Sequence, residues 1–272
     1  FVFQTIDRYQ VSLFKIPATY MYPTTFQKVA YIRIGSHTKP LTDYPAEEDA
    51  LRYLLRTTSF EQEIAKGGLS NGDIASLLDI QTYFDKLTFP QPETTTAVVE
   101  KFATEGLTKA TGRQYGITNL GALLFAKDLR QFEGLESKAI RVVQYESTNK
   151  RETKVDHYFY KGYASVFSDV VDYVYALLPA KERLERGIRK RITAYSEMAV
   201  RELIANALVH QDFYHQGPIL IELFTDRIEI SNPGKPLIET DRFIDTYSAR
   251  NEKLADLMRR LGICERLGSV FD

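Results

Sequence analysis

The chain has 272 residues, 44% of them hydrophobic, which is enough to bury a substantial core. Its formal net charge of −1 excludes the overall basic character that is typical of many nucleic-acid-binding proteins. The single cysteine, Cys264, excludes an internal disulfide framework, and no apolar run approaches the roughly 18 residues of a membrane-spanning helix. We therefore expect a protein of the reducing cytoplasm that does not enter a membrane.

The first 58 residues are predicted to form a small β-rich unit. Two runs of β-type composition, Tyr9–Ile16 and Lys28–Ile34, predict strands, and the prolines between them predict a turn. Pro45–Leu55 predicts a helix, because acidic residues occupy its first turn before an apolar run. Since Phe1 stands directly before strand-like sequence, we expect the unit to begin earlier than this sequence does.

The next residues predict a mostly helical segment that ends in a winged-helix-like element. Residues 59–90 are predicted to be helical, with breaks at their glycines, and the proline-rich run 89–96 predicts a joint. A helix at Ala97–Thr104, a hairpin and a helix at Asn119–Lys127 follow. Winged helices read DNA in many proteins and serve as packing units in others, and the lack of a Lys/Arg-rich helix here favours packing.

The remainder of the chain predicts strands and helices in mixed order. The strands are Ala139–Tyr145, Ile219–Phe224 and Arg227–Ile230, and the helices are Tyr163–Leu178, Glu197–His210 and Asn251–Leu261. The last two strands are adjacent and predict an antiparallel hairpin. The basic cluster Lys181–Arg191 has two interpretations. It is either a solvated helix end, which its two interleaved glutamates favour, or a patch that contacts phosphates.

The helix at Glu197–His210 carries the most specific pattern in the chain. An apolar stripe is predicted to face a sheet, and it consists of Val200, Leu203, Ile204, Ala207 and Leu208. Glu202 and Asn206 lie one turn apart on the opposite face, among small and apolar residues rather than Lys and Glu. This face is either the wall of a pocket or a second packing face with an internally satisfied Glu–Asn pair.

Together with the strand that ends in IEISNPGK, this helix resembles two of the three nucleotide-contacting motifs of the GHKL ATP-binding fold. The resemblance implies that Asn206 helps to hold a Mg²⁺ ion that bridges the phosphates of ATP. It also implies that Glu202 positions or deprotonates the attacking water in members that hydrolyse ATP. Asn232 stands where the fold has an aspartate that accepts from the adenine amino group, and Gly234 where the backbone approaches the base. The uncharged acceptor implies weaker adenine affinity or a relaxed choice of base.

The resemblance extends to the end of the chain. The third motif, a glycine-rich turn, is matched by Gly268 and Ser269. Residues 237–262 are predicted to form a mobile lid over the nucleotide, because lids must open. A metal pair of His210 and His215 is disfavoured, since two histidines without a third ligand do not make a typical zinc site.

Four stretches in order resemble one bacterial family, the RecG-related transcriptional regulators: residues 117–129, 199–213, 226–237 and 250–269. Its members usually begin with a Schlafen-type Alba-like domain. The stretch YIRIGSHTKP at 31–40 resembles the closing strand of that domain. The resemblance implies an α+β protein with three parts. These are the C-terminal part of an Alba-like domain (1–58), a helical linker with a winged-helix-like element (59–130), and a GHKL-type α/β sandwich that binds ATP (131–272).

The resemblance leaves three functional hypotheses. In the first, ATP binding controls either assembly or the binding of nucleic acid, with DNA favoured, through the Alba-like part. In the second, the protein is a hydrolysing ATPase with Glu202 as the base. In the third, the GHKL-type part is a degenerate scaffold used for dimerisation. A homo-oligomer is expected, and helicase activity is not, because neither a G-x-x-x-x-G-K-[ST] phosphate loop nor helicase motor motifs occur.

Overall fold

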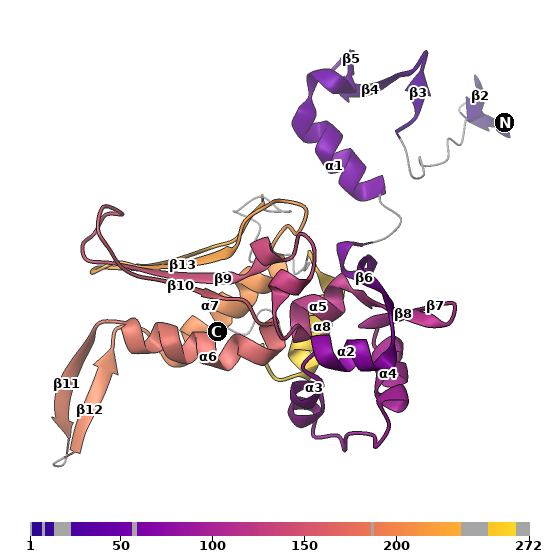
Figure 1. Ribbon diagram of the computed structural model, residues 1–272. Helices are drawn as coiled ribbons and strands as arrows, with labels where there is room; N and C mark the ends of the chain where they lie inside the picture. Colours follow the sequence, from indigo (N-terminus) through magenta and orange to yellow (C-terminus); the bar gives the residue numbers. More distant parts are fainter. Residues whose placement is uncertain are drawn as a thin grey trace. The chain divides into compact units, whose positions relative to one another are not determined.

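The computed structural model describes residues 2–6, 9–13, 23–55, 59–185, 188–234 and 250–264 (Figure 1). Contacts divide the chain into two units, Phe1–Ser59 and Phe60–Asp272. Helices and several separate sheets occur together, so the predicted α+β class is confirmed, whereas the finer division into three parts stays a prediction. Within the described ranges no helix is long and apolar enough to cross a bilayer.

The first unit contains short antiparallel strands and one helix. β1 (Val2–Ile6) pairs with β2 (Tyr9–Leu13), and β4 (Val29–Ile34) pairs with both β3 (Thr25–Phe26) and β5 (His37–Pro40). α1 follows and has the predicted bounds, Pro45–Leu55. Residues 14–16 of the first predicted strand lie outside the described residues.

The second unit opens with the segment that was predicted to contain a winged-helix-like element, and that name is kept below for residues 60–118. Its antiparallel sheet has the order β6-β8-β7, formed by Ile64–Leu69, Gln114–Thr118 and Thr108–Thr111. Three helices lie between β6 and β7 in the chain: α2 (Asn71–Leu77), α3 (Ile80–Leu87) and α4 (Thr95–Thr104). The helical prediction for residues 59–90 is therefore wrong at β6. This strand exists because it pairs with β8, which lies far along the chain and is invisible to local propensity.

α5 (Asn119–Phe125) is a fully buried helix that follows the element directly. Thr118 caps it by accepting a hydrogen bond from the Gly121 N–H (3.1 Å). Position 121 has no room for a side chain, because a Cβ there would lie 2.2 Å from the Leu107 carbonyl oxygen. The helix ends before the predicted Lys127, since the Lys127 N–H bonds to the Leu77 carbonyl instead of continuing the helix. Short 3-10 turns at Leu129–Gln131 and Glu136–Lys138 lead to the main sheet.

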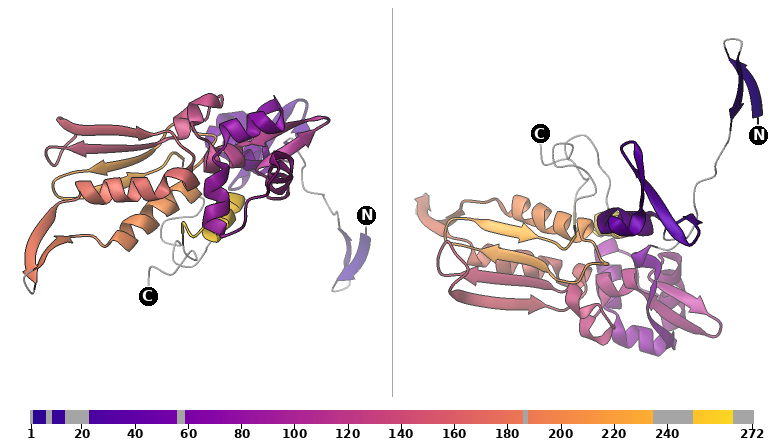
Figure 2. Two further views of the ribbon diagram at one scale, coloured as in Figure 1. Left: turned by 60° about the horizontal axis from the view of Figure 1, so that its bottom comes forward. Right: turned by 90° about the horizontal axis from the view of Figure 1, so that it is seen from above.

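The main sheet has the order β10-β9-β13-β14, formed by Thr153–Phe159, Ile140–Tyr145, Ile219–Leu223 and Ile228–Ser231. β9 and β13 are parallel, whereas the two outer pairs are antiparallel. α6 (Tyr163–Leu177) and α7 (Glu197–His210) lie along one face of the sheet (Figures 1 and 2). The sheet side chains that enter the common core alternate along the strands, as in Ile219, Ile221 and Leu223. β10 was not predicted, because this exposed edge strand lacks an apolar alternation.

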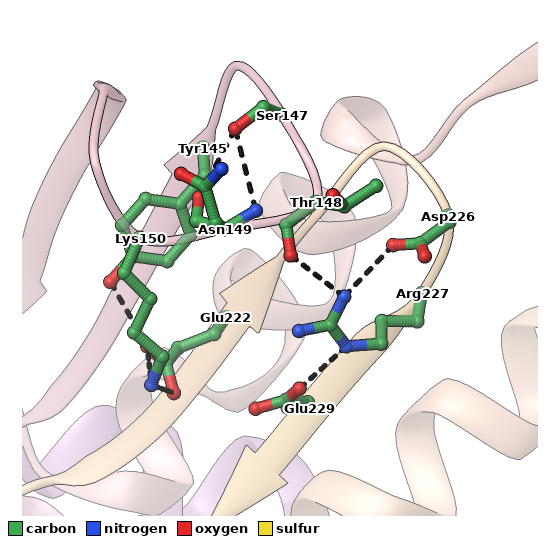
Figure 3. Close-up of polar contacts among 9 residues, drawn as sticks. All are labelled: Tyr145, Ser147, Thr148, Asn149, Lys150, Glu222, Asp226, Arg227 and Glu229. Carbon is green, nitrogen blue, oxygen red and sulfur yellow. Dashed lines mark hydrogen bonds and ion pairs between the residues drawn. The ribbon is translucent and has the colours of Figure 1, made fainter.

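The opposite face of the sheet carries a polar cluster that holds the β9–β10 connection (Figure 3). Buried Glu222 on β13 accepts from the Tyr145 hydroxyl (3.0 Å) and pairs with the Lys150 Nζ (2.6 Å). Arg227 beside β14 pairs with Glu229 (2.6 Å) and donates to the Thr148 carbonyl (3.0 Å). Residues 148 and 150 are thereby fixed to the β13–β14 hairpin.

The basic cluster between α6 and α7 forms a separate hairpin. β11 (Ala180–Glu185) pairs antiparallel with β12 (Ile188–Thr193), and the hairpin extends beyond the end of α6 (Figures 1 and 2). The solvated helix end favoured for Lys181–Arg191 is therefore wrong. The two halves of the cluster are each other's hydrogen-bonding partners, and its charge pattern alone could not show this pairing.

α8 (Glu252–Arg260) confirms the last predicted helix, with Asn251 and Leu261 as its flanking caps. Gly262 follows at φ +66, and the N–H groups of Gly262 and Ile263 bond to the carbonyls of Arg259 and Met258 (3.0 and 2.9 Å). α8 packs into the core through Leu254 and Met258. This tight packing counts against the predicted lid at residues 250–262, and residues 237–249 of that lid lie outside the described residues.

Candidate functional site

α7 has the predicted bounds but faces its surroundings differently. Ser196 caps it by accepting from the Ala199 N–H (3.1 Å), and Val200, Ile204 and Leu208 are buried as predicted. Leu203 is 52% exposed and does not belong to the buried stripe. Because an α-helix turns 100° per residue, Leu203 lies on the same side of α7 as Asn206 and His210. This is the open side of the helix.

The two predicted site residues on α7 lie at the border of that open side. Glu202 is only 7% exposed, whereas Asn206 is half-buried one turn later. Burial raises the pKa of the Cys264 thiol, and the charge of Glu202 raises it further. Glu202 therefore lies near Cys264, the last described residue. The chain therefore approaches Glu202 shortly before the third predicted motif. Gly268 and Ser269 themselves lie outside the described residues.

The turn at Asn232–Gly234 lies against the carboxyl end of α7. β14 leads into this turn, and α7 contacts β14. The Asp212 N–H donates to the Pro233 carbonyl (3.0 Å), two residues beyond the end of α7. Gly234 has φ +108, and a Cβ there would lie 2.4 Å from the Asp212 Cβ. Asn232 and Gly234 therefore lie beside the C-terminal end of α7, where their turn contacts Asp212.

Asp212 is the centre of a buried polar network that sequence reasoning did not single out. Its carboxylate binds Arg250 at 2.6 Å, and the two side chains are 9% and 8% exposed. The same carboxylate accepts from the Tyr214 N–H (3.1 Å) and lies 3.1 Å from the His215 ring nitrogen. A buried ion pair of this kind is costly to break, because either partner alone would leave an uncompensated charge. The position of Asp212 directly after the motif helix was the available signal.

Asn251 completes the connection between α7 and α8. Its buried side-chain amide donates to the carbonyls of Val209 (2.9 Å) and Gln211 (2.8 Å), which lie at the end of α7. The last carbonyls of a helix have no partner within the helix, so this amide satisfies groups that would otherwise be buried unpaired. Residues 250–251 therefore fix the start of α8 to the end of α7.

A metal site built by the protein alone and a Mg²⁺ ion bound together with ATP make different demands on the protein. Among the described residues, no group of three or more His, Cys, Asp or Glu side chains is arranged to hold a metal ion. A Mg²⁺ ion bound with ATP would require less from the protein, because it takes most of its oxygen ligands from phosphates and water. Half-buried Asn206, with one amide oxygen on the open side of α7, fits that limited role.

Comparison with known proteins supports the nucleotide-domain part of the resemblance. Residues 216–271 match a family model described as "Putative ATP-dependent DNA helicase recG C-terminal". No curated protein matches the chain. The crystal structure of the DIP2311 protein from Corynebacterium diphtheriae is similar with a TM-score of 0.56 and 18% sequence identity. The match covers 89% of this chain and 46% of that one.

The structural match shows a shared fold, and the chain spans less than half the length of that relative. The family match includes β13, β14, the Asn232–Gly234 turn and α8, and of these the turn and the start of α8 meet the end of α7. The C-terminal part of this chain is therefore similar to the ATPase-like domain of the RecG-related family.

Proposed function

We propose that the protein binds ATP between α7 and the Asn232–Gly234 turn, and that the bound state controls nucleic-acid binding or assembly through residues 1–58. The observation that carries this proposal is the meeting of α7 with the turn at the Asp212–Pro233 hydrogen bond. This contact joins the Glu202 and Asn206 helix to the segment that matches the ATPase-like family.

Each side chain has a role that its surroundings support. The Asn232 amide oxygen would accept a hydrogen bond from the adenine amino group, and Gly234 lets the turn pack closely against Asp212, which keeps Asn232 beside the end of α7. Asn206 would contribute one oxygen ligand to Mg²⁺, which neutralises phosphate charge when it is bound. Helicase activity is not proposed, because the chain has no phosphate loop or motor motif.

ATP hydrolysis is a second candidate function, and the position of Glu202 favours it. Its carboxylate is buried one helical turn from Asn206, where it could take a proton from a water beside the bound phosphates. In the third candidate the domain binds no nucleotide and serves only for dimerisation. Saturable ATP binding would exclude this candidate, and loss of hydrolysis with retained binding in Glu202→Gln would identify Glu202 as the base.

The central test is the Asn206→Ala variant. We expect Mg²⁺-ATP affinity to fall by about tenfold or more, as is typical when support for a metal site is lost. Calorimetric titration measures the affinity, and the thermal shift with and without Mg²⁺-ATP separates binding from folding. Asn149→Ala, an exposed asparagine in the β9–β10 connection, is the matched control and should keep the full shift.

Two outcomes would contradict the assignment. An equal ATP-induced shift in wild type and Asn206→Ala would remove Asn206 from the site. If Asn206 is a structural amide, the variant would instead lose ~1–3 kcal/mol of stability whether or not nucleotide is present. No ATP-induced shift in the wild type would favour the scaffold.

A further inference from the structure

The β11–β12 hairpin concentrates positive charge in a chain whose net charge is −1. Its two strands hold five basic residues and only two acidic ones, Glu182 and Glu185. The basic residues are Lys181, Arg183, Arg189, Lys190 and Arg191. The proposed ATP site uses none of them.

The backbone register of the hairpin pairs two positions of like charge and two of opposite charge. Position 183 (Arg) is paired with 190 (Lys), whereas position 182 (Glu) is paired with 191 (Arg), and like charges at paired positions destabilise an antiparallel pair. The hairpin forms a sheet of its own, without a third strand from any described segment, and an isolated two-stranded sheet is marginally stable in water. The pair of positions 183 and 190 is thus the one whose charges disfavour the hairpin, and an anionic partner would offset this effect.

Both faces of the hairpin carry cationic positions. By the backbone register, positions 181, 183 and 190 belong to one face together with the acidic position 185, and positions 189 and 191 belong to the other together with the acidic position 182. A flat anionic surface, such as a membrane, would meet only one of these faces. A groove with phosphates on both sides would meet both.

The dimensions of the hairpin agree with a nucleic-acid groove. Each strand has six residues, which corresponds to a length of roughly 20 Å. The major groove of B-form DNA is about 12 Å wide and admits a two-stranded β-ribbon, whereas the major groove of duplex RNA is deep and narrow. We propose that the β11–β12 hairpin is a DNA-binding arm that enters the major groove and contacts phosphates on both sides.

The test compares two charge-removing variants of the full chain. The first is the double variant Arg183→Gln/Lys190→Gln in the hairpin. The second is Lys109→Gln/Arg113→Gln in the exposed β7–β8 wing, which removes the same charge from the wing of the winged-helix-like element. Affinity for a short mixed-sequence DNA duplex is measured across a salt series. Each phosphate contact contributes close to one unit to the slope of log affinity against log salt.

The hairpin variant should bind DNA more weakly, with a slope shallower by about 2, while the wing variant keeps the wild-type slope. The melting temperature of the hairpin variant should stay unchanged or rise, because the two like charges at positions 183 and 190 have been removed. This opposite change in binding and stability distinguishes loss of a contact from loss of folding.

Unchanged affinity and slope in the hairpin variant would overturn the proposal, as would an equal loss in the wing variant. Loss of binding to phosphatidylserine vesicles with unchanged DNA binding would also overturn it and identify a membrane surface as the partner. Equal binding to duplex RNA, with equal loss in the hairpin variant, would refute entry into the DNA major groove. These measurements need no ATP, so their failure leaves the proposed nucleotide site untested and intact.

Discussion

At the scale of single residues, the candidate site requires a glycine at position 234. Gly234 adopts φ +108, a conformation that side-chain-bearing residues rarely take, and its backbone lies directly against Asp212. The Asp212 N–H holds the neighbouring Pro233 carbonyl at 3.0 Å, so the turn cannot move away without losing this bond. Gly234 thus allows the turn to reach the end of α7.

Gly234→Ala is expected to destabilise the protein by roughly 1–3 kcal/mol from backbone strain alone, with a further cost from the contact with Asp212. The matched control is Gly112→Ala in the β7–β8 wing, where φ is +68 and no atom lies within 4 Å of an added Cβ. This control should lose only about 1 kcal/mol. Urea denaturation of both variants measures the difference. Equal losses would mean that the turn and Asp212 are not in close contact.

At the scale of elements, α8 is fixed at both ends by carboxylates from the winged-helix-like element. Buried Glu61 accepts from the Leu254 N–H (2.6 Å) and so caps the start of the helix. Glu105, at the end of α4, binds Arg260 in the last turn through two hydrogen bonds (2.7 and 2.9 Å). The residues of α8 lie within the ATPase-like family match, and the helix also contacts the winged-helix-like element through Glu61 and Glu105.

The Glu105–Arg260 contact predicts a defined pH dependence. Hydrogen bonds from Arg260, Lys101 and Tyr83 lower the pKa of Glu105 from 4.5 to about 2, although partial burial opposes this shift. Because the folded-state pKa is depressed, this stabilisation is present above pH 4.5 and is lost as the pH falls toward about 2. Solvent around the half-exposed Arg260 screens the pair and limits its contribution to about 1 kcal/mol.

Denaturant unfolding of wild type and Glu105→Gln at a series of pH values checks this prediction. The variant should be less stable at neutral pH, and the difference should shrink steadily below pH 4.5. A difference that stays constant down to the acid limit would show that Glu105 stabilises by packing rather than by charge.

At the scale of the whole molecule, the main hydrophobic cluster of the described residues lies within the second unit. Every buried member of the hydrophobic cluster falls between Leu69 and Ile263, and it includes residues of the winged-helix-like element, α5, the main sheet and α8. A continuous core of this kind unfolds as one cooperative unit. The winged-helix-like and ATPase-like elements are therefore expected to melt together.

A fragment of residues 60–272 should consequently fold by itself. Calorimetry should show one main transition at the melting temperature of the same transition in the full chain, because the buried cluster is retained. Two separate transitions in the fragment would instead support a boundary near residue 130. An unfolded fragment would show that residues 1–59 are needed for the second unit.

The sequence by itself determined the elements whose signals are local. α1 and α7 have their predicted bounds, since acidic first-turn residues or a serine cap mark where each begins. The β13–β14 hairpin was predicted because its two strands are adjacent in the chain. The motif pattern on α7 and at Asn232–Gly234 also pointed to the ATPase-like domain that the family match supports.

Only the tertiary structure decided the features that depend on distant partners. β6 is a strand because β8 pairs with it, and residues 180–193 are a hairpin because their two halves pair. The wheel of α7 placed Leu203 in the apolar stripe, but the sheet and neighbouring helices bury other sides of the helix, including Glu202. The Asp212–Arg250 pair joins residues 38 apart in sequence. Such contacts arise when separate elements pack together, and short-range periodicity carries no information about which elements will meet.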